Sequence, residues 1–201
     1  MKFSTATAVC GLALGVMAMP TFESALPAGY TEYIPEWEVE LYRGGPMVKA
    51  RGTVEEVRAE MIKRNPDFET HYPINTTVID EEFAVLDKRT DFTGSTHYCA
   101  NMGPAKLSRV KEGIAYLRSL KGQPTNGPGP GACGRVSCSW NSGIWWCNND
   151  TNPKTLNGWS SIADGAYYVM IICSGNMLKD TLSGEAIHPT RWSVRVGGAK
   201  C

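Results

Sequence analysis

The chain has 201 residues, with 20 Lys and Arg against 20 Asp and Glu, and 42% of its residues are hydrophobic. This composition excludes a disordered, collagen-like or polytopic membrane chain, and the length allows one domain or two small ones. The net charge of zero argues against an electrostatic partner only if the charges are spread evenly. We therefore examine the charge of each half separately below.

Residues 1–18 have the features of a secretory signal peptide. Lys2 is followed by an uncharged run that extends to Met17, and small residues precede the expected cleavage point. The run is shorter than the roughly 20 apolar residues of a membrane-spanning helix. We expect a secreted, extracellular protein without stable membrane insertion, which loses Cys10 with the leader.

The six remaining cysteines all lie in the second half of the chain, and residues 19–98 contain none. An even number of cysteines in an oxidising compartment predicts disulfides. These cysteines are Cys99, Cys133, Cys138, Cys147, Cys173 and Cys201.

A dibasic pair, Lys88-Arg89, stands just before the cysteine-rich half and is followed by a polar stretch that we expect to be open to a protease. We expect proprotein processing after Arg89. The alternative is a retained N-terminal subdomain with an accidental Lys-Arg pair. A second pair, Lys63-Arg64, falls in the last turn of a predicted helix, where cations suit the helix dipole.

That helix is predicted by a capping box at Thr53 and Glu56, and it ends before Pro66. A strand is expected near Trp37 to Tyr42. Both elements belong to the acidic segment at 19–89.

The charge is distributed unevenly between the two parts. Residues 19–89 hold fourteen acidic and eight basic side chains, a net charge of −6; residues 90–201 hold six acidic and eleven basic, a net charge of +5; Lys2 supplies the last +1. We expect an acidic pro-segment at 19–89 that assists folding or masks a binding face of a basic mature domain at 90–201. The alternative is that it only improves solubility in transit.

The mature domain is predicted to contain two helices, from about Pro104 to Leu120 and from about Asn157 to Cys173. A hairpin is predicted within 133–148, and strands near 185–188 and 192–196. The order helix, hairpin, helix, hairpin predicts an α+β fold, in which a disulfide-stapled antiparallel sheet has two helices packed on one face, an α/β sandwich.

For the hairpin we predict a three-residue turn at 141–143, with Trp140 opposite Ile144. This register places Cys138 and Cys147 on opposite faces, so that they should not be bonded to each other, and it leaves Trp145 exposed on the polar face. In this register Cys138 faces the helices, and Cys173 at the end of the second helix should face the sheet. We therefore predict a Cys138–Cys173 disulfide. The other four cysteines then have three possible pairings, which stay open.

The run from Pro130 through Cys133-Gly-Arg-Val-Ser-Cys-Ser-Trp-Asn-Ser-Gly-Ile-Trp-Trp-Cys147, the Ile-Ala-Asp-Gly-Ala helix and the Trp-Ser-Val-Arg-Val strand resemble small cysteine-rich secreted proteins of filamentous fungi, a group of candidate effectors. The resemblance covers about residues 97–201. The order of elements is also similar to the killer-toxin-4-like fold. The resemblance implies a toxin-like protein or effector that acts outside the producing cell, and it transfers no catalytic residue.

No cysteine spacing suits a zinc site and no nucleotide-binding or hydrolase motif occurs, so we expect no metal and no cofactor. We favour a non-enzymatic protein, with a small ribonuclease-like hydrolase as the alternative. The residues of that alternative acid/base site are His97, His188, Arg135 and Glu185.

For binding, we expect a monomer whose basic surface recognises an extracellular target, such as an anionic surface, a receptor or a channel. The candidate contact residues are Arg135, Trp145, Lys106, Arg109 and Lys111. Asn75 and Asn149 begin glycosylation sequons, which would make the product a glycoprotein.

Overall fold

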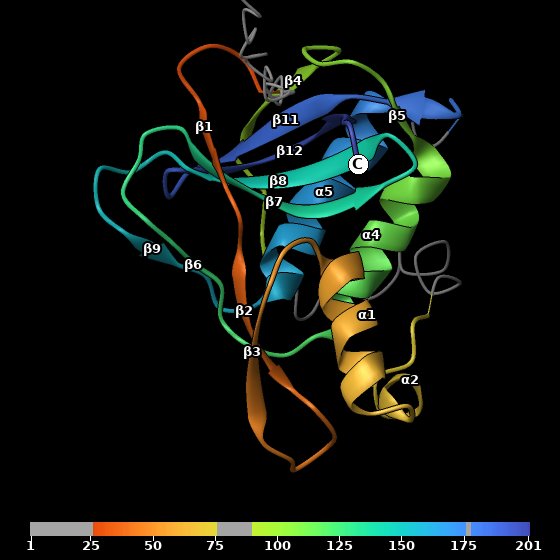
Figure 1. Cartoon of the computed structure of the whole chain (residues 1–201). Coiled ribbons are helices and arrows are strands. Elements are labelled where there is room, and N and C mark those ends of the chain that lie inside the picture. The colour runs from red at the N-terminus through yellow and green to blue at the C-terminus, as the bar shows by residue number, and fades with distance from the viewer. Residues whose placement is uncertain (1–25, 76–89, 176–177) are drawn as a thin grey trace, which may run out of the picture.

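A computed structural model describes residues 26–75, 90–175 and 178–201 of the chain (Figure 1). The signal peptide at 1–18 and the dibasic pair Lys88-Arg89 lie outside the described residues. The domain boundaries therefore stay predictions, although most of the acidic segment and almost all of the basic one are described.

Six strands form one large sheet in the order β1-β7-β8-β12-β11-β4. Every neighbouring pair is antiparallel except β1 and β7, which run parallel along one edge of the sheet (Figure 1). The predicted mixed fold with an antiparallel-rich sheet is confirmed. The bounds are β1 (Thr31–Tyr33), β7 (Ala132–Ser139), β8 (Ser142–Asn148), β12 (Trp192–Gly198), β11 (Gly184–His188) and β4 (Thr96–Cys99).

Three short antiparallel pairs accompany the large sheet. They are β2 (Glu36–Glu40) with β3 (Met47–Arg51), β5 (Ala105–Lys106) with β10 (Thr181–Leu182), and β6 (Thr125–Asn126) with β9 (Lys154–Thr155). The β2–β3 hairpin extends away from the large sheet (Figure 1).

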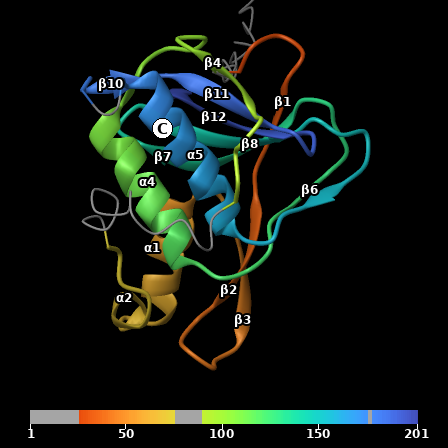
Figure 2. The same ribbon diagram turned by 180° about the vertical axis from the view of Figure 1, so that it is seen from behind.

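The described helices are α1 (Val54–Arg64), α2 (Phe68–His71), α4 (Leu107–Ser119) and α5 (Trp159–Cys173). The helices predicted from about 104 to 120 and from about 157 to 173 are thus confirmed with slightly shorter ends. Figure 2 shows α4 and α5 side by side in front of the sheet. α5 packs on β11 and β12, α4 on β7 and β8, and α1 on β7 and α4.

α1 begins at the predicted capping box, because the Glu56 carboxylate accepts the backbone N–H of Thr53 at 2.7 Å. Its apolar face enters the same hydrophobic cluster as the helices of the cysteine-rich half. The indole of Trp37 on β2 stacks on that of Trp159 at 3.5 Å between ring centroids. The acidic and basic segments therefore share one core.

The structure contains three disulfides, Cys99–Cys173, Cys133–Cys147 and Cys138–Cys201. The predicted Cys138–Cys173 bond is wrong. The expectation that Cys138 and Cys147 are not bonded to each other is confirmed, because each has another partner. The predicted reason is wrong, since both lie on the face of the sheet away from the helices.

A β-bulge explains this error in the predicted faces. The register of β7 against β8 shifts between Arg135 and Ser137, so that Val136 and Ser137 both face the helices. The residue after the bulge, Cys138, then turns to the opposite face. One extra residue therefore reverses the side of every later residue in the strand.

The hairpin turn is also one residue earlier than predicted. Trp140 and Asn141 form a two-residue turn with φ of 47° and 59°, and Ser139 pairs with Ser142. Ile144 consequently lies opposite Ser137 rather than Trp140. The tryptophan in the turn is 69% exposed, whereas Trp145, which we expected to be exposed, is completely buried.

We expect Trp37→Ala to lower the free energy of unfolding of the full chain by about 3–5 kcal/mol, because it empties the stacking position against Trp159. Trp140→Ala is the matched control and should cost less than about 1 kcal/mol. Urea unfolding followed by circular dichroism measures both. Equal effects of the two substitutions would contradict a core shared between the acidic and basic segments.

Candidate functional site

A row of alternating cationic and aromatic side chains crosses the face of the sheet away from the helices. Arg135 on β7 is the direct cross-strand partner of Trp145 on β8, and Trp145 is the partner of Arg195 on β12. Such partners lie close enough for their side chains to touch. We call these three residues the arginine–tryptophan row.

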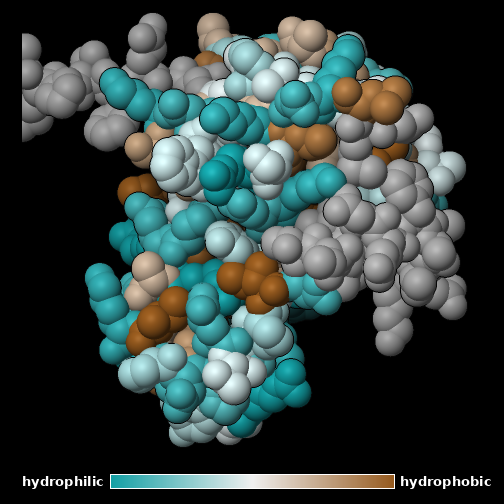
Figure 3. Space-filling model, turned by 90° about the vertical axis from the view of Figure 1, so that its right-hand side faces the viewer, coloured by the Kyte–Doolittle hydropathy of each residue, from teal (hydrophilic) through white to brown (hydrophobic). Residues whose placement is uncertain are grey.

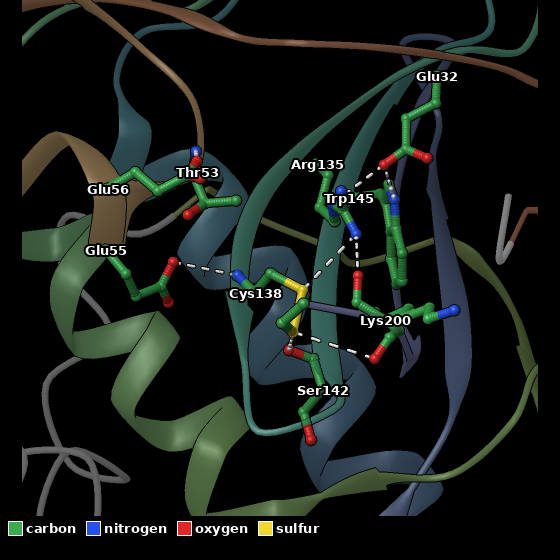
Figure 4. A network of polar contacts seen from close by, with 11 residues as sticks. Glu32, Thr53, Glu55, Glu56, Arg135, Cys138, Ser142, Trp145 and Lys200 are labelled. Carbon is green, nitrogen blue, oxygen red and sulfur yellow. Dashed lines mark hydrogen bonds and ion pairs between the residues drawn. A yellow bond between two sulfur atoms is a disulfide. The ribbon is translucent and has the colours of Figure 1, made fainter. Parts of the chain in front are cut away.

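A glutamate from the acidic segment binds one end of this row. The Glu32 carboxylate, on β1, accepts the indole N–H of Trp145 at 3.2 Å and pairs with Nε of Arg135 at 3.1 Å. Nη1 of Arg135 also donates to the backbone oxygen of Lys200 at 2.9 Å. Figure 4 shows Glu32 reaching both partners at once. The buried indole N–H therefore has its acceptor in the acidic segment.

A tyrosine from the same segment covers the other end of the row. The ring of Tyr30 lies 4.6 Å from the guanidinium carbon of Arg195, in cation–π geometry. Arg195 is 2% exposed and donates to Glu185 at 2.9 Å. Tyr30 and Glu32 are two residues apart, so both can project from one side of an extended segment onto the row.

The indole of Trp145 has room because Gly143, two positions earlier on the same face of the strand, has no side chain. A Cβ at Gly143 would stand 2.6 Å from the Trp145 ring and 2.9 Å from the side chain of Ala199. Leu26 and the Cys133–Cys147 disulfide complete the small apolar cluster around this ring. The burial of Trp145 thus depends partly on residues of the acidic segment.

A second glutamate joins the acidic segment to the helix-covered side of β7. The Glu55 carboxylate, on α1, accepts the hydroxyl of Ser137 at 2.6 Å and the backbone N–H of Cys138 at 3.0 Å. Figure 4 shows Glu55 approaching Cys138 from the side opposite to Glu32. Burial raises the pKa of Glu55, and the two hydrogen bonds only partly oppose this effect.

The candidate basic side chains at the start of α4 are placed differently from one another. Lys106, at the end of β5, is exposed beside the hairpin, and Lys111 of α4 lines a pocket with it. Arg109 pairs with Glu112 at 2.8 Å and lies over the ring of Trp140 at 5.1 Å. Trp140 is therefore a candidate contact residue that is missing from the set expected from the sequence, where Trp145 was the exposed tryptophan.

Trp140 occupies a turn position with positive φ, which favours Asn or Gly. Its exposed ring, with the Arg109 guanidinium over it, is accessible to a partner. The two-residue Trp-Asn turn could have been considered from the sequence, but Asn-Ser-Gly offered a better turn signal.

Figure 3 shows a largely hydrophilic face with small, separate hydrophobic patches.

The four residues of the hydrolase alternative do not come together. His97 and His188 contact the same aromatic cluster, through Tyr168 and Phe92 respectively. Glu185 is instead buried against Arg195 on the other face. Arg135 lies on β7, three strands away from β11 in the sheet order.

Both glycosylation candidates are described. Asn75 is exposed after α2, and Asn149 is half-buried directly after β8, where its backbone N–H donates to the Arg191 oxygen at 3.1 Å. The processing candidates Lys88 and Arg89 lie outside the described residues.

We expect Glu55→Gln to remove a pH dependence of stability while keeping both contacts, because the amide oxygen can accept the Cys138 N–H and the amide nitrogen can donate to the Ser137 hydroxyl oxygen. Because the pKa of Glu55 is raised above its ordinary value of 4.5, the folded state holds a proton more tightly than the unfolded state. Its contribution to the free energy of unfolding therefore increases as the pH falls through the raised pKa toward 4.5. Urea unfolding at several pH values should show that the free energy of unfolding of the native protein increases relative to that of Glu55→Gln in this direction. Carboxyls whose pKa is lowered, such as that of Glu40, act alike in both proteins and cancel in the difference.

Two further variants define the role of this carboxylate. Glu55→Ala leaves the Ser137 hydroxyl and the Cys138 N–H without their acceptor and should cost about 1–3 kcal/mol. Glu38→Gln, at a side chain that is 64% exposed, is the matched charge control and should change neither stability nor its pH dependence. An unchanged pH profile in Glu55→Gln would contradict this assignment.

Among the described residues, no group of three or more His, Cys, Asp and Glu is placed to hold a metal ion. None of the described helices combines the length and the apolar character of a membrane span. Comparison with family models, with curated proteins and with solved structures returned no match to this chain.

Proposed function

We propose that this chain is a secreted proprotein, cut after Arg89, whose disulfide-stapled basic part acts as an effector or toxin-like protein on another cell. It binds an extracellular anionic target as a monomer and without a cofactor. The three disulfides support an extracellular location. The scattered positions of the four hydrolase candidates favour binding over catalysis.

One observation carries the binding proposal. Glu32 presents a carboxylate to a guanidinium and an indole N–H of the basic part at the same time. A guanidinium beside an aromatic ring is a common recognition element for carboxylates and other anions. In the precursor, the acidic segment occupies the arginine–tryptophan row as an internal ligand.

The acidic segment is the pro-segment in this proposal, and it also assists folding. The described residues of this segment contain no cysteine, so no disulfide ties residues 26–75 to the basic part. The acidic segment is bound to the basic part through the shared core and through ion pairs such as Lys121–Glu40 at 3.5 Å. After the cut the segment is a separate chain, which an anionic target displaces from the row by mass action.

Intact-mass analysis of the secreted product tests the processing. We expect a chain that begins at Thr90, with or without a separate acidic chain. A secreted product in which residues 19–89 remain covalently attached would contradict the processing proposal.

Salt elution from a dextran sulfate resin, used as the polyanion, tests the masking. We expect the protein to elute at higher salt after the acidic segment has been cut and removed, because Arg135 and the rest of the row become accessible. Arg135→Gln should reduce the retention of the cut protein more than that of the uncut one. Lys179→Gln, at an exposed lysine, removes the same charge and should affect both forms equally.

Equal effects of Arg135→Gln in the two forms would contradict the masking. The masking would also be contradicted if removal of the acidic segment raised the retention no more than the loss of that segment's own negative charge explains. A variant carrying Glu32→Gln should bind more strongly than the native precursor even without the cut, because its internal ligand has lost its charge.

A further inference from the structure

We propose that the fold contains a ready-made site for the new amino terminus, in which the α-ammonium group of Thr90 pairs with the carboxylate of Asp164. This inference rests on the proposed cut after Arg89. It adds a positive charge at one defined atom, the backbone nitrogen of Thr90. That nitrogen already lies 2.9 Å from Oδ2 of Asp164 in the uncut chain.

The contacts that place Thr90 come from the part of the chain after it. Phe92 is 5% exposed, and its ring packs against Tyr168 and Trp192 at 5.4 Å between centroids in each case. This burial corrects our expectation that the stretch after Arg89 is open throughout. Because Phe92 anchors the chain, Thr90 keeps its position when the bond before it is broken.

A histidine provides a second anchor. Nε2 of His188 lies 3.0 Å from the backbone oxygen of Asp91, and Nδ1 accepts the backbone N–H of Thr190 at 3.2 Å. Since Nδ1 is an acceptor, Nε2 carries the proton and donates it to Asp91. The backbone on the C-terminal side of Thr90 is thereby tied to β11.

Asp164 on α5 is well suited to receive a cation. It is 8% exposed, and its Oδ1 accepts a hydrogen bond from Arg118 of α4 at 3.2 Å. The guanidinium of Arg118 lies over the ring of Tyr167 at 5.5 Å. The two carboxylate oxygens therefore point in two directions, one toward α4 and the other toward Thr90.

The chemical change at the cut is a hydrolysis by a dibasic-specific protease with water as the co-reactant. The C–N bond between Arg89 and Thr90 breaks, the water oxygen becomes part of the Arg89 carboxylate, and the Thr90 nitrogen leaves as an ammonium group at neutral pH. A neutral amide N–H donor is thus replaced by a charged one at the same atom. Before the cut only the acceptor carries a charge; after it both partners do, so the attraction between opposite charges adds to the existing hydrogen bond.

The pocket next to this site leaves the new terminus accessible to solvent. It has a volume of about 800 Å³ and is lined by Thr90, Asp164 and Tyr167 together with residues of the anchoring stretch. The ammonium can rotate its three N–H groups there without displacing the backbone. A small reagent can also reach the amine, so that any protection from reaction reports the ion pair rather than simple occlusion.

The test uses the full chain, secreted from a host without dibasic protease and then cut after Arg89 in vitro. Acetic anhydride labels the amine only in its neutral form, so the pH dependence of labelling of the Thr90 peptide gives its pKa by mass spectrometry. An ordinary α-amine has a pKa of about 7.7–8.0. We expect the pairing to raise it by about one unit, which slows labelling near neutral pH about tenfold relative to the same amine in urea.

Asp164→Asn should abolish this protection, while Asp91→Asn is the matched control at the adjacent exposed carboxylate and should change it much less. If Asp164→Asn does not fold, the pKa of the amine in the native sequence still decides the question. A pKa in the ordinary range would overturn the proposal. A normal secreted product that is never cut would instead overturn the processing, and the amine produced in vitro would still report on the site.

Discussion

The stack of Trp37 on Trp159 is the interaction on which the rest of the structure depends. Trp159 is the first residue of α5, the helix that packs on β11 and β12 and carries both Cys173 and Asp164. Trp37 belongs to the acidic segment and is 1% exposed. Because this pair lies in a core to which both parts contribute, the described parts of the chain form a single folded unit in spite of the difference in charge and cysteine content.

This shared core explains why a three-residue strand can complete the sheet. β1 pairs with the edge of β7 and would have little stability alone, but the hairpin and helix that follow it are held in the core. An uncovered β7 would be an exposed edge beside a buried tryptophan. The same strand that protects this edge brings Glu32 to the arginine–tryptophan row, so the proposed folding assistance and the proposed masking both depend on one element.

The sequence predicted the helices well because their apolar residues follow one period over many turns. Ile114 and Leu117 of α4, and Ile162 and Ala166 of α5, all face the core at such spacings. The sequence-based prediction failed for the hairpin because a single bulge at Val136 reverses the faces of Cys138 and Ser139, and no local sequence pattern marks a bulge. The wrong disulfide follows from that register. Trp145 lies on the face expected for it, but Leu26 and Glu32 of the acidic segment bury it there, and Trp140 is exposed because it lies in the turn. The contacts of Glu32 and Glu55 connect residues more than 80 positions apart, and no periodicity reports such pairs.

The two proposed sites divide the consequences of one cut between the two products. Before the cut, the acidic segment is tethered, and Glu32 competes for Arg135 with the advantage of an intramolecular ligand. After the cut that advantage is lost on the acidic side, whereas the basic side gains the pair between Thr90 and Asp164. In this proposal the basic part therefore keeps its own amino terminus at Asp164 of α5 while its binding row becomes open to competition.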